Sequence, residues 1–580
     1  MGGVVRSMRR TSILACTCCA VAAAGPFPPY QVEITKVLHT GDPAPGIAGA
    51  TISYLAQPQI DGAGNVLVDP SITGPGVNAG NNLVIYYGPP GGLQIVIREG
   101  DPAPDLPSGV VIASLFGGNQ LCEAGTIWVF SQVSGPGITP GVNDTVNYVG
   151  PPGALQKIFQ SGDPAPQTEP GTIFAGGSIM LSDNGSILVR ANLAGPMVNS
   201  TNDQAMYVGY PDNPQLLWRK GMQAPGTEPG TVFAWVDDVK FNDLHHVGFR
   251  AGVTGPGVNQ SNDAGYWAGG LGALLLLARR GSGMPGAPEG AYVLSPGSFS
   301  GFSGSTDIAF AAQLAGRGVT VQDDIGTWAG PANDFDLVFR EGFPLPDLPP
   351  DVTLAVGVSG PLVTAAHHLW GIAFLQGPGV DVSNDRAIYF GPIDSPHLIM
   401  RSGDDAPTFA DGVYVSVTTT GNMSPALNDI GGHAFKTRLT GTGISAANDT
   451  VVWYRQPQTG AVLRVAQTGR LVDGLPVSQF DWIGKTGGSD GELQSFNDAG
   501  KLAARLDFSD GSKGVYVLFA HLAGDVDSDG DVDLLDSAEL QSCFAAITAV
   551  DADCAAADPS GDGLVDLEDI AMFALALTGP

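Results

Sequence analysis

The sequence predicts an all-β protein, a β-propeller of about eight four-stranded blades, followed by a small α-helical domain. Three observations support this prediction: a turn-rich composition, a marker repeated about every sixty residues, and four short apolar segments between successive markers. The 580 residues include 82 Gly and 44 Pro, yet 43% are hydrophobic. This hydrophobic share is too high for a disordered chain, so turn-rich β-structure fits both properties.

The N-terminus has the pattern of an export signal. A basic stretch ends at Arg10, an apolar run covers 13–24, and the small residues Ala22 and Ala24 stand at the −3 and −1 positions of a cleavage site. The run is too short to span a bilayer. We therefore expect 1–24 to be a signal peptide and the mature protein to be secreted or attached to the cell surface, without a transmembrane segment.

The charge argues against nucleic acid as a partner. The formal net charge is −31, from 26 basic and 57 acidic residues, and such a surface repels phosphates. Fourteen of the acids lie beyond Gly524, where neither Lys nor Arg occurs. This acidic end needs a counter-cation.

Cysteines are too few to hold the fold together. Three of the six leave with the signal, and the mature chain keeps Cys122, Cys543 and Cys554. Cys543 and Cys554 flank a short loop and could form a disulfide outside the cell. Cys122 is expected to be a lone packed thiol.

The marker Gly-x-x-Ala-Pro organises the chain into repeats. It begins at Gly41, Gly100, Gly162, Gly221 and Gly403, with degenerate copies at Gly281, Gly342 and Gly469, at intervals of 59 to 66 residues once all copies are counted. Such a period indicates a repeat architecture.

The unit from Gly162 to Gly221 predicts four strands. Their expected ranges are 174–180, 187–193, 205–208 and 215–219, separated by turn sequences. Four-stranded units repeated radially are typical of a propeller. Seven blades, two smaller propellers or an array of β-sandwiches are the alternatives.

The two ends of the repeat region are expected to close the ring. Residues 31–38 match the fourth strand of a unit but precede the first marker, whereas the unit beginning at Gly469 lacks its fourth strand. The N-terminal strand would complete the last blade and remove an exposed sheet edge.

One tandem motif resembles that of a family of exported planctomycete proteins, named for the pattern Asn-x-x-Gly-x-x-Ala-Phe (NxxGxxAF). Residues 428–435 match it in full, and 497–504 depart only at the last place, while 367–374 keep only the Ala-Phe pair. The resemblance covers about 31–521. It implies the repeat architecture and export, and implies no activity.

Asn-Asp pairs recur after the Gly-Pro loops, and two readings are open. The pairs are Asn143-Asp144, Asn202-Asp203, Asn262-Asp263, Asn384-Asp385 and Asn448-Asp449, with Asp323-Asp324 in the equivalent place. They could form a ring that binds cations or sugar hydroxyls, or they could serve turn chemistry, which we favour.

Arginines stand two residues before several markers. They are Arg98, Arg219, Arg279, Arg340 and Arg401. We expect each to pair with a repeated Asp in a structural role.

No catalytic motif stands out. The histidine pairs His245-His246 and His367-His368 invite a metal reading, but adjacent strand residues face opposite ways, which argues against it. Beyond the expected signal peptide, the sequence contains no Gly-x-Ser-x-Gly elbow, phosphate loop or Cys-x-x-Cys pair.

The acidic end contains two twelve-residue loops of EF-hand type, thirty-three residues apart. Oxygen donors fall at positions 1, 3, 5, 9 and 12, position 6 is Gly, and position 7 supplies its backbone carbonyl. The expected ligands of two Ca²⁺ ions are Asp525, Asp527, Asp529, Asp531, Asp533 and Asp536, and Asp558, Ser560, Asp562, Leu564, Asp566 and Asp569.

These loops resemble those of type I dockerins. Position 12 is Asp rather than Glu in both loops, and a single helix is expected after each, at 534–547 and 567–577. The resemblance implies a cohesin-like partner recognised through positions 10 and 11. Those positions are Leu534-Leu535 and Leu567-Glu568, which depart from the usual hydroxyl residues.

The sequence thus predicts a signal peptide (1–24), a tandem-repeat propeller (25–521) and a dockerin-like calcium-binding domain (522–580). The expected function is that of a secreted non-catalytic binding or scaffold protein, attached through calcium to a cohesin-like domain or a surface component. Polysaccharide is a candidate ligand. The alternative is a secreted hydrolase of O-glycosyl bonds in polysaccharide catabolism, because propellers host both classes.

Overall fold

The computed structural model describes residues 30–417, 425–457, 460–484, 486–487 and 491–522, together with 537, 540, 541, 543, 565, 569 and 570. The chain divides into one unit of Val32–Ala520 and a second of Met1–Gln31 with His521–Pro580. The first unit holds the repeat region.

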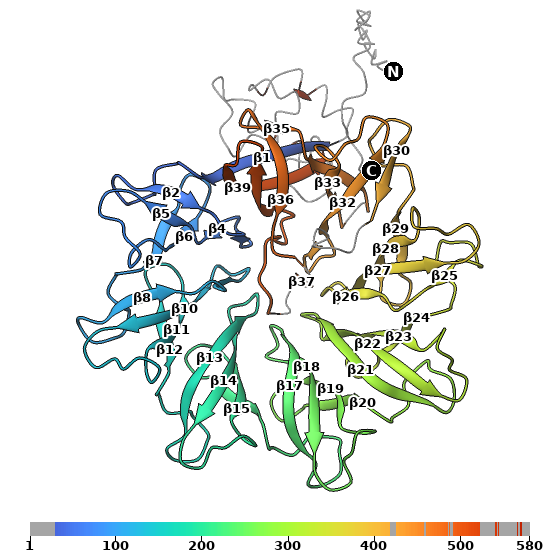
Figure 1. The fold of residues 1–580 in the computed structure, drawn as a ribbon, viewed down its shortest axis with the longest axis horizontal. Coiled ribbons are helices and arrows are strands. Elements are labelled where there is room, and N and C mark those ends of the chain that lie inside the picture. Colours follow the sequence, from blue (N-terminus) through green and yellow to red (C-terminus); the bar gives the residue numbers. More distant parts are fainter. Residues whose placement is uncertain are drawn as a thin grey trace, which may run out of the picture. The chain divides into compact units, whose positions relative to one another are not determined.

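The repeat region forms eight blades arranged radially, in chain order, around a central axis (Figure 1). Blade 1 contains β2 (Thr51–Tyr54), β3 (Gln59–Ile60), β4 (Val66–Val68), β5 (Ser71–Thr73), β6 (Val84–Gly88) and β7 (Gln94–Arg98). Blade 2 contains β8 (Val111–Leu115), β9 (Gln120–Leu121), β10 (Ile127–Ser134), β11 (Thr145–Gly150) and β12 (Gln156–Gln160). Blade 3 contains β13 (Ile173–Leu181), β14 (Ile187–Ala194), β15 (Gln204–Gly209) and β16 (Gln215–Arg219). Blade 4 contains β17 (Val232–Phe241), β18 (Val247–Thr254), β19 (Ala264–Gly269) and β20 (Leu275–Arg279).

The second half of the ring repeats this plan. Blade 5 contains β21 (Ala291–Phe302), β22 (Asp307–Gly316), β23 (Ile325–Pro331) and β24 (Asp336–Arg340). Blade 6 contains β25 (Thr353–Leu354), β26 (Ser359–Val363), β27 (His368–Gln376), β28 (Arg386–Pro392) and β29 (His397–Arg401). Blade 7 contains β30 (Val413–Ser416), β31 (Ala426–Leu427), β32 (His433–Gly441), β33 (Thr450–Arg455) and β34 (Val462–Gln467). Blade 8 contains β35 (Leu471–Val472), β36 (Leu475–Asp481), β38 (Leu502–Phe508), β39 (Lys513–Leu522) and β1 (Tyr30–His39), while β37 (Thr486–Gly487) belongs to the segment before β38.

The prediction of an eight-bladed propeller with four-stranded blades is confirmed. Each blade is antiparallel. The innermost strand is continuous in blades 3, 4 and 5, and it is broken in two in others, as in β8 and β9 of blade 2. The strands of blade 3 match the predicted ranges to within about two residues at each end. The seven-bladed, two-propeller and sandwich alternatives are wrong.

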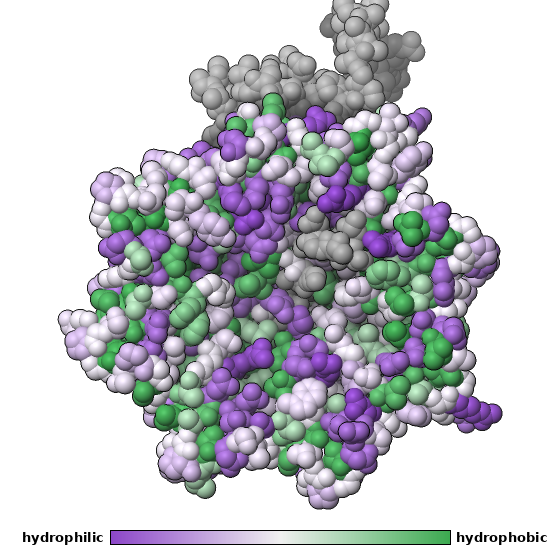
Figure 2. Space-filling view, viewed as in Figure 1, coloured by the Kyte–Doolittle hydropathy of each residue, from purple (hydrophilic) through white to green (hydrophobic). Residues whose placement is uncertain are grey.

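The hydrophobic cores lie between neighbouring blades. One cluster joins Leu188 and Met206 of blade 3 to Phe233, Phe249 and Trp267 of blade 4. Because each blade is covered on both faces, its third strand is buried at nearly every position instead of alternating, as in β15 and β19. The space-filling view of one face shows hydrophobic and hydrophilic residues interspersed over the described blades (Figure 2).

The Gly-x-x-Ala-Pro marker forms the turn that connects one blade to the next. Gly162 N donates to Phe174 O at 2.8 Å, and Phe174 N donates to Asp163 O at 2.9 Å, so the turn pairs with the first strand of the following blade. All eight marker glycines have left-handed backbone, with φ between 76° and 91°. Glycine adopts this conformation without the strain that a Cβ atom would cause.

The N-terminal strand closes the ring as predicted. β1 is the outermost strand of blade 8 and lies beside β39 (blue beside red in Figure 1). Thr40 N donates to Lys513 O at 2.8 Å, and Lys513 N donates to Thr40 Oγ1 at 3.0 Å. No described residue belongs to a helix with the length and hydropathy needed to cross a membrane.

Candidate functional site

Eight turns join the first and second strands of the blades, and all share one geometry. In each, the first residue's N–H donates to the carbonyl four residues later, and the fourth residue has left-handed backbone. This is a type I turn followed by a bulge. The fourth residues are Gly64, Gly125, Gly185, His245, Thr306, His367, Gly431 and Gly500.

The Asn of the Asn-x-x-Gly motif locks one such turn to the next. Asn428 Oδ1 accepts from Gly432 N at 2.6 Å, and its Nδ2 donates to Asn497 O at 3.1 Å in the following blade. Asn497 repeats both contacts, with Lys501 N at 2.8 Å and Asp61 O at 2.7 Å. The motif therefore has a structural role in both matched copies.

The recurring Asn-Asp pairs stabilise their own loops, which agrees with the turn interpretation. Asn202 Oδ1 accepts from Asn199 N at 2.7 Å, and Nδ2 donates to Met197 O at 3.1 Å. The Asn residues at 143, 262, 384 and 448 make equivalent contacts. The following Asp bonds a nearby side chain, as Asp203 does with Lys220 at 3.0 Å.

The predicted partner of the repeated arginines needs correction. Each Nε donates to a backbone carbonyl seventeen residues earlier, in Asn81, Asn202, Asn262, Asp323 and Asn384. Only Arg340 also pairs with the carboxylate of that slot, Asp323, at 2.8 Å. Arg219 and Arg279 instead pair with Glu169 and Glu228 on inter-blade connections. Every residue has a backbone carbonyl, so the sequence alone cannot identify one as a partner. The repeated Asp residues therefore suggested the wrong acceptor for these arginines.

The histidine pairs lie in different blades. His245 and His367 occupy the left-handed turn position, with φ of 58° and 59°. His367 Nδ1 lies 2.6 Å from Oδ2 of Asp307, whose side chain is fully buried, and His367 lines a cavity of about 490 Å³ between blades 5 and 6. The residues that the structure describes contain no cluster of three or more His, Cys, Asp or Glu able to hold a metal ion.

A segment before β38 crosses the central axis. β37 pairs in parallel with β31 of blade 7, and the carbonyls of Gly491 and Glu492 accept from Gln120 Nε2 of blade 2 at 3.0 and 2.9 Å. The Glu492 carboxylate lies 2.8 Å from Lys240 Nζ of blade 4. The segment therefore contacts blades 2, 4 and 7 near the centre of the ring (orange in Figure 1). The sequence analysis missed it, because only the larger spacing after Gly469 signals the insertion.

Near the axis, the surroundings of Glu123 raise the pKa of its side chain. Asp498 N donates to Glu123 Oε1 at 3.1 Å, and Gln494 Nε2 donates to Oε2. Burial, and then the nearby charge of Asp498, raises the pKa of Glu123 to about 7. This carboxyl group is thus partly protonated at neutral pH.

A second repeated position faces the gap between neighbouring blades. We define the blade-gap position as the residue five places after the left-handed turn residue. It is occupied, from blade 1 to blade 8, by Asp69, Phe130, Arg190, Arg250, Ala311, Ile372, Lys436 and Arg505.

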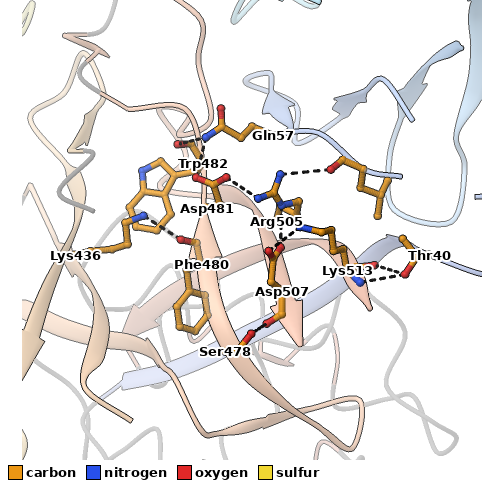
Figure 3. Close-up of polar contacts among 11 residues, drawn as sticks. Thr40, Gln57, Lys436, Ser478, Phe480, Asp481, Trp482, Arg505, Asp507 and Lys513 are labelled. Carbon is orange, nitrogen blue, oxygen red and sulfur yellow. Dashed lines mark hydrogen bonds and ion pairs between the residues drawn. The ribbon is translucent and has the colours of Figure 1, made fainter. Parts of the chain in front are cut away.

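The blade-gap cations of blades 7 and 8 are fully engaged (Figure 3). Lys436 Nζ donates to Phe480 O at 3.0 Å and lies 4.1 Å from the ring centre of Trp482. Burial lowers the pKa of Lys436 to about 8. Arg505 pairs with Asp481 at 2.8 Å and with Asp507 at 2.9 Å. These contacts tie the last blades together.

The predicted calcium ligands fall almost entirely outside the described residues. Of the twelve, only Asp569 is described; its side chain is fully buried, and its backbone is helical. Residues 537, 540, 541, 543 and 570 are also helical, within the two predicted helices.

Cys543 is disulfide-bonded, and Cys554, its predicted partner, lies outside the described residues. Cys122 is buried and free, and burial raises the pKa of its thiol to about 11.

The comparisons find two family models in the chain. The family of unknown function DUF7453 matches residues 22–148 and 148–520. The dockerin type I domain matches residues 523–577. Type I dockerins bind calcium and attach proteins to cohesin-bearing partners, and proteins that carry them are typically extracellular or associated with the cell surface. No curated protein matches the sequence.

Two solved structures show weak likeness to the chain. They are the β-propeller domain of the Trilobed protease from Pyrococcus furiosus (TM-score 0.32, 8% identity) and the acylaminoacyl peptidase of Pyrococcus horikoshii (TM-score 0.32, 8% identity). The matches cover 71% and 70% of this chain, and 97% and 53% of the respective relatives. Scores this low carry no argument about function.

The family models and the fold divide the chain at the same place. The eight blades lie within the two DUF7453 matches, apart from the last residues of β39, and the two loops predicted to bind calcium lie within the dockerin match. Because the DUF7453 model covers well over half of the sequence, the protein belongs to this family of unknown function, and it carries a type I dockerin domain behind its propeller.

Proposed function

We propose that this protein is an exported, non-catalytic binding or scaffold protein whose dockerin domain attaches it to a partner outside the cell. Its parts are a signal peptide (1–24), a propeller (25–521) and a calcium-binding domain (522–580). The resemblance to the NxxGxxAF family belongs to the same proposal and supports export. The partner is a cohesin-like domain or a cell-surface component.

The observation that carries the proposal is the pair of twelve-residue loops within the dockerin match. The first loop binds one Ca²⁺ through Asp525, Asp527, Asp529, Asp531, Asp533 and Asp536, and the second binds another through Asp558, Ser560, Asp562, Leu564, Asp566 and Asp569. Calcium neutralises an end with fourteen acids and no basic residue, so binding and folding are coupled there.

Calorimetric titration of the full-length protein with calcium tests the proposal. We expect two ions per chain, and one ion for either Asp525→Ala or Asp558→Ala, because each removes position 1 of one loop. Asp510→Ala, an exposed acid of the propeller, is the control and should leave both sites intact. A full-length protein that takes up no calcium at millimolar concentration would refute the attachment mechanism.

The partner is tested by capture on an immobilised cohesin domain with calcium or chelator. Positions 10 and 11 are Leu534-Leu535 and Leu567-Glu568. Exchanging Leu534 and Leu535 for Ser and Thr should therefore strengthen capture by cohesins that select hydroxyl residues. Release of reducing sugar from any polysaccharide by the same protein would instead favour the hydrolase alternative.

A further inference from the structure

A cavity of about 370 Å³ lies between blades 3 and 4. β13 to β16 supply most of its wall, and Val236 of β17 supplies the rest. Its volume falls within the range of small-ligand sites. The polar side chains that line it are Ser178, Arg190, Asn192, Gln204 and Trp218.

Arg190 is the blade-gap residue of blade 3, and the three other cations at this position have partners. Arg250 in blade 4 pairs with Asp237 at 2.6 Å and donates to Gly297 O at 3.2 Å. Lys436 and Arg505 are engaged in the same way (Figure 3). Among the described residues, the side chain of Arg190 has neither a hydrogen bond nor an ion pair, and it is exposed to solvent.

The register explains why Arg190 lacks a counter-ion. Asp237 is the cross-strand neighbour of Arg250, and Ser178 is the cross-strand neighbour of Arg190. Serine thus stands where the next blade has the carboxylate that neutralises the cation. No carboxylate is among the residues that line the cavity.

The other polar groups that line the cavity also lack hydrogen-bond partners among the described residues. The side chains of Ser178, Asn192 and Gln204 make no hydrogen bond with described residues, and the buried indole N–H of Trp218 has none either. A buried donor left without a partner costs free energy. The wall therefore offers one guanidinium surrounded by neutral hydrogen-bonding groups.

From these observations we propose that the cavity binds a carboxylate attached to a hydroxylated ring, the chemistry of a hexuronic acid. Arg190 pairs with the carboxylate, because its planar guanidinium matches two carboxylate oxygens at once. The hydroxyl and amide groups of Ser178, Asn192 and Gln204 bond the ring hydroxyls. Arg190 and Asn192 are exposed, so the cavity is open to solvent, and no carboxylate among the lining residues neutralises the guanidinium. The site is independent of calcium-dependent attachment, since it lies wholly within the propeller.

Calorimetric titration of the full-length protein with sodium D-galacturonate, at fixed ionic strength and with calcium chelated, tests the proposal. D-galactose lacks the carboxylate, and sodium acetate lacks the ring. We expect galacturonate to bind at least about tenfold more tightly than either control. Equal binding of acetate would overturn the ring contacts, and absence of galacturonate binding would overturn the site.

Two variants test the residues. Arg190→Gln should weaken galacturonate binding about tenfold or more. Ser178→Asp should have the same effect while keeping the arginine, because it rebuilds the ion pair of blade 4. Asp510→Ala is the control, and melting curves establish that each variant is folded. Undiminished binding by either cavity variant would contradict the assignment.

Discussion

The Nδ2 atom of Asn497 donates a 2.7 Å hydrogen bond to the carbonyl oxygen of Asp61, 436 residues earlier in the chain. The same side chain accepts from Lys501 N at 2.8 Å, so one buried amide closes its own turn and joins blade 8 to blade 1. Asn497→Ala leaves Lys501 N without this acceptor and removes the inter-blade bond to Asp61 O, which keeps its bond from Gly64 N.

We expect Asn497→Ala to lower the free energy of unfolding by about 2 to 4 kcal/mol, from two lost contacts in a buried place. Denaturant unfolding of the full-length protein measures it. Asn213→Ala removes an exposed amide that bonds only Gln215, and its cost should stay within about 0.5 kcal/mol. Similar costs for the two variants would contradict the role of Asn497 in ring closure.

Two marker glycines differ in the space around them. Gly41 and Gly221 have φ of 91° and 86°, but a Cβ atom at Gly41 meets nothing within 4 Å, whereas at Gly221 it lies 2.8 Å from Thr201 O. Gly41→Ala should cost about 1 kcal/mol from backbone strain alone. Gly221→Ala should cost about 1 to 2 kcal/mol more because of the clash. Melting temperatures of the two variants in the reverse order would be inconsistent with this geometry.

The repeated arginines are structural in this fold. Arg219 is 7% exposed, its Nε donates to Asn202 O at 3.0 Å, and its Nη1 lies 2.6 Å from Glu169. Arg219→Met should destabilise the protein by about 2 kcal/mol, since charge-assisted bonds are lost in a buried place.

Lys36→Met is the matched control for Arg219→Met. It breaks a pair 3.6 Å long whose lysine is 48% exposed, and such surface pairs contribute about 0 to 1 kcal/mol. If Arg219→Met changed galacturonate binding but left the melting temperature unaltered, the structural role would be wrong.

Glu123 should make stability depend on pH. Its pKa is raised from 4.5 to about 7 in the folded protein, so the folded state binds more protons than the unfolded state between these values. Stability from this group is fully present below pH 4.5 and is lost as the pH rises through 7. Glu123→Gln should remove this loss.

The measurement is the difference in unfolding free energy between the wild type and Glu123→Gln from pH 4 to 8. The free energy of unfolding of Glu123→Gln should increase relative to that of the wild type as the pH rises. Glu289→Gln is the control, because it removes the same charge at an exposed position. A difference that does not vary with pH would contradict the raised pKa.

The repeat made most of the propeller predictable. The eight markers define the blade number because every blade needs a left-handed turn at the same place, which only Gly fills without strain. The ring closure was predictable because 31–38 carry the pattern of an outer strand without the rest of a blade.

Contacts made through backbone atoms were not predictable. The carbonyl partners of Arg98 and Arg219, and the axial segment held by Gln120, depend on where the chain passes rather than on which residues it carries. The cavity beside Arg190 was missed for a related reason. Its signal is one Ser in place of Asp, which is visible only once the strand register aligns blade 3 with blade 4.

The pairing of β1 with β39 also sets the order of events in biogenesis. The strand that leaves the ribosome first finds its neighbour only when the last strand of the ring has been made. The ring therefore cannot close before β39 has been synthesised, and contacts between such distant segments form slowly.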